Sequence, residues 1–325
     1  MATTKLEVLY KYILWSALIF LKKCYSKIRK VSERKVKMQS KEIMLGAVVV
    51  LYNPCEDEIK NINTYKNLVD ITIIIDNSEI NHRELVDLLV TLDSKVYYYS
   101  EQLNLGLCKA LNIGIEMLTV KGCQWVLVFD SDSKLGSDIV TVYKNAIEDY
   151  KRGEIKRGGE IAVFAPVHDF DRRKHSSYHG YKDVEWKMTS GCLFNCDIFK
   201  SQNGFKEELF VDGLDMDYCF KSHENGYRII ECGEAVINHH PAETKSFLGF
   251  KYGIASPVRY YMQARALIWC WMRYKNPKML GFYLYKWVKV LFLFPHKKAY
   301  ICEMAKGTKD GHELFKSSRN LIEKK

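Results

Sequence analysis

Stretches with the patterns of strands and helices alternate along residues 44–130. Near-continuous runs of β-branched and other apolar residues predict four strands, at 44–52, 71–76, 96–100 and 125–130. Between them, apolar positions at helical spacing predict three helices, at 56–67, 81–92 and 107–119. This alternation predicts an α/β fold with a Rossmann-like mixed sheet flanked by helices.

The regular pattern weakens after residue 150. A charged, glycine-containing stretch, KRGEIKRGGE, is followed by an apolar run at 161–166 and a strand-like run at 186–194. We interpret this half as the acceptor side of the same domain. The chain therefore divides into an N-terminal segment, a catalytic domain and a helical C-terminal extension, at 1–42, 43–245 and 246–325.

Two apolar segments lie near the ends of the chain. Tyr12–Leu21 is uncharged, and its ten residues are too few to cross a bilayer. The sequence KKCYSKIRK follows it in place of a small-residue cleavage site, which favours a basic amphipathic interfacial helix over a signal peptide. Gly281–Phe294 repeats the pattern, with Lys286 and Lys289 on one helical face. A core helix with a solvated tail is the alternative, but two such segments favour docking on an anionic membrane surface.

The net charge of +10 is unevenly distributed. Residues 1–41 hold 11 Lys/Arg against 2 Asp/Glu, and residues 246–325 hold 16 against 4, which leaves an acidic body. This distribution argues against a nucleic-acid partner. The ten cysteines are scattered without a C-x-x-C pair, which indicates reduced thiols in a cytoplasmic protein. Together with the basic ends of the chain, this predicts a protein that is peripheral on the inner face of the membrane.

Polar residues follow three of the predicted strands. Asn53, Asp76 and the pair Asp130 and Asp132 stand at strand ends, and the carboxyl ends of parallel strands share the ligand-binding edge of a sheet. The pair could hold one hard divalent cation and the polyphosphate that the cation neutralises. Two solvated turn aspartates are the alternative, because D-x-D occurs at two further places in this chain.

A stripe of small residues marks the helix predicted at 107–119. Gly106, Ala110 and Gly114 recur every four residues, with Asn104 and Asn112 beside them. On a helix such a stripe lets either backbone or a flat ligand approach closely. The spacing leaves both alternatives open.

Eight motifs occur in a fixed order between about residues 44 and 275. They are V-x-Y-N-P, I-I-D-N-S, N-x-G with A-x-N-x-G, F-D-S-D-S, T-S-G, D-G-L-D-M-D, N-H-H and R-Y-Y-x-x-x-R. This set resembles glycosyltransferase family 2, and more narrowly its bacterial rhamnosyltransferase-type members. Two departures, F-D-S-D-S for the usual L-D-Q-D-S and Ala266 where an asparagine often follows the arginine, leave the nucleotide sugar open.

The resemblance implies a GT-A fold, a nucleoside-diphosphate sugar donor, Mg²⁺ or Mn²⁺, and inverting transfer to a hydroxyl. Carried over by motif, Asp76 would hold the nucleotide base, and Asp130 would touch the ribose or metal. Asp132 would ligate the metal, and His239 would reach the metal or diphosphate. Asp215 would be the general base. The remaining implied donor-site residues are Asn53, Asn104 and Gly106, and the acceptor-side or secondary residues are Thr189, Ser190, Asp212, Asp217 and Arg265.

The residues themselves agree with an acid–base role near residue 215. In LFVDGLDMDYCF, apolar residues space a helical face, and a partly desolvated carboxylate at the start of that helix would have a raised pKa. Spacing does not separate Asp212, Asp215 and Asp217, and Asp212 could instead cap the helix.

The resemblance and the basic ends of the chain predict an enzyme that transfers a sugar to a lipid-linked saccharide in surface polysaccharide assembly. The preferred sugar is rhamnose, with dTDP-rhamnose as the donor. A hexosyltransferase with a UDP-sugar donor is the alternative. A sugar nucleotidyltransferase would need a glycine-rich phosphate loop, and VLYNPCEDE supplies none. A non-catalytic scaffold would not need the complete acidic set.

Overall fold

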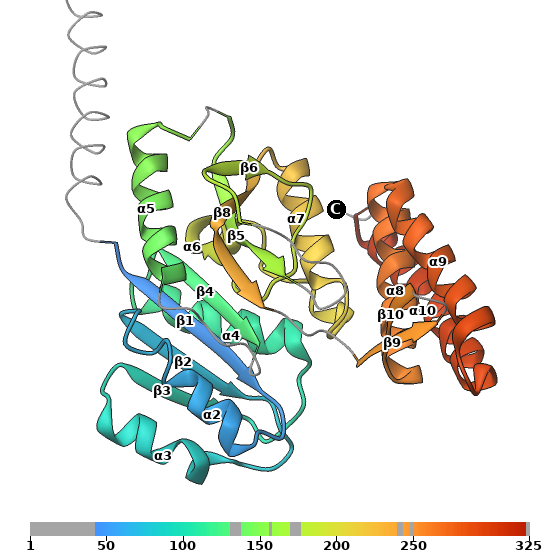
Figure 1. Cartoon of the computed structure of the whole chain (residues 1–325), viewed down its shortest axis with the longest axis horizontal. Coiled ribbons are helices and arrows are strands. Elements are labelled where there is room, and N and C mark those ends of the chain that lie inside the picture. The colour runs from blue at the N-terminus through green and yellow to red at the C-terminus, as the bar shows by residue number, and fades with distance from the viewer. Residues whose placement is uncertain are drawn as a thin grey trace, which may run out of the picture. The chain divides into compact units, whose positions relative to one another are not determined.

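The computed structural model describes residues 43–130, 138–155, 158–169, 177–238, 243–247 and 250–322. Residues from Met44 onward form one compact unit. Its centre is an eight-stranded mixed sheet in the order β3-β2-β1-β4-β7-β5-β8-β6 (Figure 1). The strands are β1 Leu45–Leu51, β2 Ile71–Asp76, β3 Val96–Ser100, β4 Trp125–Asp130, β5 Ile161–Asp169, β6 Tyr181–Asp183, β7 Leu193–Asn195 and β8 Arg228–Asn238. The predicted mixed sheet flanked by helices is confirmed.

Strands β3, β2, β1 and β4 are parallel, and all of β1 and β2 is buried. Burial on both faces explains why their sequences are continuous apolar runs rather than alternating ones. The connecting helices are α2 Glu56–Ile62, α3 Arg83–Leu92, α4 Leu107–Val120 and α5 Asp138–Arg152. In α4, a Cβ on Gly114 would lie 2.3 Å from Val48 Cγ2, so this part of the small-residue stripe serves close packing of the helix on β1.

The second half of the sheet differs from the prediction. The strand expected at 186–194 is wrong for most of its length, because β7 comprises only Leu193–Asn195 and Gly191 turns the chain with φ +74°. Strand β7 runs antiparallel to both β4 and β5. Strand β8, which sequence reasoning missed, pairs with β5 through a shift in register between Pro166 and Val167.

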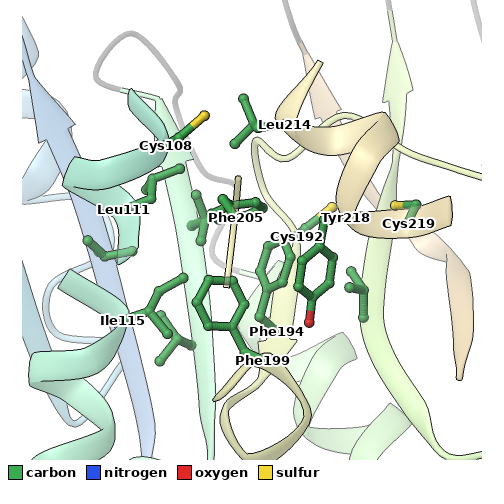
Figure 2. Packing of buried hydrophobic residues seen from close by; sticks show 14 of the residues in the cluster. Cys108, Leu111, Ile115, Cys192, Phe194, Phe199, Phe205, Leu214, Tyr218 and Cys219 are labelled. Carbon is green, nitrogen blue, oxygen red and sulfur yellow. The ribbon is translucent and has the colours of Figure 1, made fainter. Parts of the chain in front are cut away.

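An aromatic cluster fixes α4 beside α7 (Leu214–Glu224), with α6 (Cys196–Ser201) contributing to the same core. Figure 2 shows Phe194, Phe199 and Phe205 packed between residues of α4 and Tyr218 of α7. Their ring centroids are 5.0–5.9 Å apart, mostly edge to face, which is a favourable aromatic geometry. The cluster therefore sets where α7 begins relative to the ends of the parallel strands.

The C-terminal extension is helical, as predicted. A hairpin of β9 Glu243–Phe247 and β10 Phe250–Ile254 precedes α8 Pro257–Tyr274, α9 Pro277–Leu293 and α10 Lys297–Ile322, which pack side by side (Figure 1). Within the described part of the chain, no helix combines the length and apolarity needed to cross a membrane. The segment 1–42 lies outside the described residues.

Lys286 and Lys289 share one face of α9, as predicted, and this face is turned toward the neighbouring elements. Lys289 is buried and donates from Nζ to the Gly253 carbonyl oxygen at 2.9 Å, and Lys286 Nζ donates to Gln263 Oε1 at 2.7 Å. Both lysines therefore face the neighbouring elements. Residues spaced by three along a helix share a face, but the sequence does not say whether that face is inside or outside.

Candidate active site

The carboxyl ends of the parallel strands lie in register at one edge of the sheet. Leu51 pairs with Asp76, Asp76 with Ser100, and Val50 with Asp130. The residues that follow these strands therefore meet at the same edge, as the polar strand ends predict.

Asp76 is buried at this edge as an ionised group. Its Oδ1 accepts from the Ser78 backbone N–H at 3.1 Å, and its Oδ2 accepts from the His82 N–H at 3.0 Å and the Tyr98 hydroxyl at 2.6 Å. Burial works against the charge, but these hydrogen bonds outweigh it and lower the pKa of Asp76 below its ordinary value. The Asp76 carboxylate thus fixes the conformation of the chain that follows β2.

A network of backbone and amide hydrogen bonds joins the neighbouring loops. The Asn53 N–H donates to Ser78 Oγ at 2.7 Å, from a residue in the left-handed region with φ 48°. Asn77 Nδ2 donates to Asn104 Oδ1 at 3.1 Å, and Asn77 Oδ1 accepts from the Leu105 N–H at 2.8 Å. Asn77 is thus a site residue that sequence reasoning did not single out, although it lies in the I-I-D-N-S motif.

Gly106 shapes the entry into α4. Its φ is +81°, and a Cβ there would lie 2.5 Å from the Phe210 ring. The Phe210 carbonyl oxygen also accepts from the Cys108 N–H at 3.1 Å. The loop that precedes α7 is therefore tied to the start of α4, and Gly106 makes that contact sterically feasible.

Asp215 is half-buried in the first turn of α7. Burial and, to a smaller extent, the nearby carboxylates of Asp212 and Asp130 together raise its pKa to about 6, against the Met216 N–H, which donates to Oδ1 at 2.8 Å. The structure therefore brings Asp215 within electrostatic range of Asp130, the carboxylate at the end of β4. Asp130 and Asp215, which are 85 positions apart, therefore share one acidic region. A catalytic base that faces a donor site would have to lie in such a region.

The three aspartates of D-G-L-D-M-D have different surroundings. Asp212 Oδ2 lies 2.8 Å from Arg259 Nε, and burial raises its pKa despite the charges of Arg259 and Lys286. Asp217 is buried, and its Oδ1 accepts from Trp269 Nε1 at 2.7 Å and the Tyr274 hydroxyl at 2.8 Å. These contacts commit Asp217 to the packing of α7 on α8 and leave Asp215 as the carboxylate beside Asp130.

The T-S-G turn runs beside the end of β4. Gly191 donates to the Val128 carbonyl oxygen at 2.8 Å, and the Ser190 carbonyl oxygen lies 2.8 Å from His168 Nε2. Thr189 is buried, and its Oγ1 has no hydrogen-bond partner among the described residues. Arg265 lies on α8, where Nη2 donates to the backbone carbonyl of Glu208.

Asp132 and His239 lie outside the described residues. Within the described ranges no group of three or more His, Cys, Asp or Glu side chains converges as a metal site. The fit to a divalent cation therefore depends on Asp130 and on the negative charge that raises the pKa of Asp215. Carboxylate oxygens and an excess of negative charge suit Mg²⁺ or Mn²⁺.

Known proteins share this fold and part of this sequence. The S. aureus TarS 1–349 structure in complex with UDP-GlcNAc superposes with a TM-score of 0.53 at 12% identity, over 86% of this chain and 92% of that one. A structure of GalNAc-T7 with UDP, GalNAc and Mn²⁺ also gives a TM-score of 0.53, at 13% identity over 84% of this chain; the match spans 56% of GalNAc-T7. In sequence, the dTDP-rhamnosyl transferase RfbF of Shigella flexneri is 25% identical over 233 residues, or 67% of this chain and 77% of that protein.

The sheet, the acidic edge and these likenesses define a glycosyltransferase with a GT-A fold. Residues 48–152 match the family model described as Glycosyl transferase family 2. Over these residues the match confirms the resemblance to this family that was drawn from the motifs.

Proposed function

We propose that this enzyme inverts configuration as it moves a sugar from a nucleoside-diphosphate donor to a hydroxyl of a lipid-linked saccharide. Our preferred donor is dTDP-rhamnose, and surface polysaccharide (O-antigen or capsule) assembly is the pathway. The likeness to a dTDP-rhamnosyl transferase supports the donor. The basic ends of the chain support a lipid-carried acceptor at the inner face of an anionic membrane.

The observation that carries the proposal is the carboxylate of Asp215. Its pKa of about 6 makes it largely ionised at neutral pH while it remains basic enough to accept a proton. In the proposed step, the acceptor hydroxyl oxygen attacks the anomeric carbon while Asp215 accepts the hydroxyl proton. The bond from that carbon to the diphosphate oxygen breaks, and its electron pair leaves with the diphosphate.

We assign the donor to the edge formed by Asn53, Asp76, Asn104, Gly106 and Asp130. The buried Asp76 carboxylate and the Asn77–Asn104 hydrogen bond hold these loops ready for the nucleotide. A bound Mg²⁺ or Mn²⁺ would supply positive charge to the departing diphosphate. Asp132 and His239 are the proposed ligands, with Asp130 at the ribose or the metal.

The test is a transfer and donor-hydrolysis assay with dTDP-rhamnose or UDP-sugars, in Mg²⁺, in Mn²⁺ and in chelator. We expect nucleoside diphosphate to be released with dTDP-rhamnose and a metal, and not in chelator. Asp132→Ala should weaken metal-dependent donor binding. Turnover with UDP-sugars alone would establish the UDP-hexosyl alternative, and no turnover with any donor would support a non-catalytic scaffold.

A further inference from the structure

Helix α9 presents an apolar face to solvent. Six of its large hydrophobic side chains are between 42% and 74% exposed: Phe282, Leu284, Tyr285, Val288, Leu291 and Phe292. Leu284, Val288 and Leu291, and likewise Tyr285, Val288 and Phe292, follow one another at three or four residues, which places them along one side of the helix. We call this set the α9 face.

The rest of α9 is anchored in the fold. Met279 and Val290 are buried, and Lys289 Nζ reaches the Gly253 carbonyl oxygen at 2.9 Å. The α9 face is therefore not the frayed end of a helix. An apolar patch of this length held in solvent by a packed helix marks a surface that binds something.

The charges around the helix indicate what binds. Helix α9 contains no Asp or Glu; the exposed Lys275 precedes it, and the exposed Lys297 and Lys298 follow it. The occupant should therefore offer an apolar layer beneath a negatively charged surface. A second copy would oppose one basic surface to another, because residues 246–325 hold 16 Lys/Arg and 4 Asp/Glu.

We infer that α9 lies flat in the interface of an anionic lipid bilayer, with the α9 face among the acyl chains and the flanking lysines at the headgroups. A 17-residue helix with aromatic residues on its apolar side suits this position. The inference gives the proposed membrane partner a defined surface on the protein. It rests on that proposal for the acceptor, and not on the identity of the sugar or on the transfer step.

The same helix contacts the site on its inner side. Lys286 of α9 donates to Gln263 of α8, and the charge of Lys286 acts on Asp212, three residues before Asp215. A helix with its side chains is about 10–12 Å across. Docking through the α9 face would therefore hold the Lys286 side of the helix, whose charge acts on Asp212, about one helix diameter from the lipid.

Flotation of the full-length protein tests the inference, with vesicles of phosphatidylcholine and phosphatidylglycerol in equal amounts and vesicles of phosphatidylcholine alone. Leu284→Ser with Phe292→Ser removes two exposed side chains and should lower the partition coefficient about tenfold or more. The matched control is Leu92→Ser with Val120→Ser, which removes two still more exposed hydrophobic side chains (81% and 82%) from α3 and α4 and should float like wild type. Lys297→Gln with Lys298→Gln should weaken binding to the anionic vesicles and leave the neutral ones unchanged.

Unchanged flotation of the α9 variant, with an unfolding midpoint equal to that of wild type, would overturn the inference. A wild-type dimer that becomes a monomer in the α9 variant, again with unchanged flotation, would assign the face to a second copy and overturn it as well. Asp215→Asn should float like wild type. A failure of the proposed transfer step would appear in the transfer assay, and a failure of the docking would appear in flotation, so the two can be distinguished.

Discussion

Replacing Asp215 by Asn should stabilise the protein and stop transfer at the same time. The pKa of Asp215 is about 6 against an ordinary value of 3.8, mainly because burial disfavours the charged carboxylate and also because the carboxylates of Asp212 and Asp130 lie nearby. A shift of roughly 2 units corresponds to about 3 kcal/mol of destabilisation by the ionised form. Contact with solvent screens part of it, so we expect Asp215→Asn to raise the free energy of unfolding by about 1 to 2 kcal/mol at pH 7.5.

The pH dependence follows from the raised pKa. Above pH 6 the group is ionised in both folded and unfolded protein, and the destabilisation is fully present. Between pH 6 and 3.8 the folded protein binds the proton first, so the advantage of the Asn variant should shrink as the pH falls through 6. Urea unfolding of both proteins at several pH values, without donor or divalent cation, measures this difference.

Activity should change in the opposite direction. Removal of a general base costs roughly 10²- to 10⁴-fold in rate, so the Asn variant should bind donor yet transfer very slowly. The rate of wild type should rise with pH through a limb near 6. Full activity of Asp215→Asn, or a variant less stable than wild type at every pH, would refute this reasoning.

Three further predictions concern positions outside the reacting groups. Asp217→Ala should lower the free energy of unfolding by about 2–4 kcal/mol, because it leaves Trp269 Nε1 and the Tyr274 hydroxyl buried without their acceptor. Urea unfolding measures this loss, and an unchanged midpoint would contradict the prediction. Gly106→Ala should weaken the affinity for the nucleotide sugar, because φ at this position is +81° and the new Cβ would press on the Phe210 ring. Calorimetry gives the Kd, and an affinity equal to that of wild type would argue against the assignment of Gly106 to the donor site. Deleting residues 1–41 removes 11 Lys/Arg and should reduce flotation with anionic vesicles, and equal flotation with neutral vesicles would contradict the electrostatic part.

The first half of the fold could be predicted from sequence because its signals are local. Three predicted strands, at 71–76, 96–100 and 125–130, have the observed bounds, since each is an apolar run ended by a polar residue or a turn. The second half depends on distant partners. Strand β8 carries charged residues and a glycine, and its pairing with β5 skips several residues, so no alternation announces it.

The candidate site divides in the same way. Motif order located the acidic groups, and parallel strands imply a shared edge for Asp76 and Asp130. Sequence could not rank Asp212, Asp215 and Asp217, because the ranking depends on Arg259 and Trp269, which lie more than 40 residues away on α8. The sequence also could not show whether Lys286 and Lys289 face the fold or the solvent, because their partners Gln263 and Gly253 lie on other elements.

The central claim is that an acidic edge of this fold holds a nucleoside-diphosphate sugar beside the Asp215 carboxylate. Thermal unfolding with a panel of nucleotide sugars and Mn²⁺ tests it most directly, since a ligand of the folded protein at about 100 times its Kd adds about 2.7 kcal/mol. We expect dTDP-rhamnose to raise the midpoint with Mn²⁺ present, and to lose this effect with chelator and in Asp132→Ala. A midpoint that no nucleotide sugar moves, with or without metal, would contradict the account.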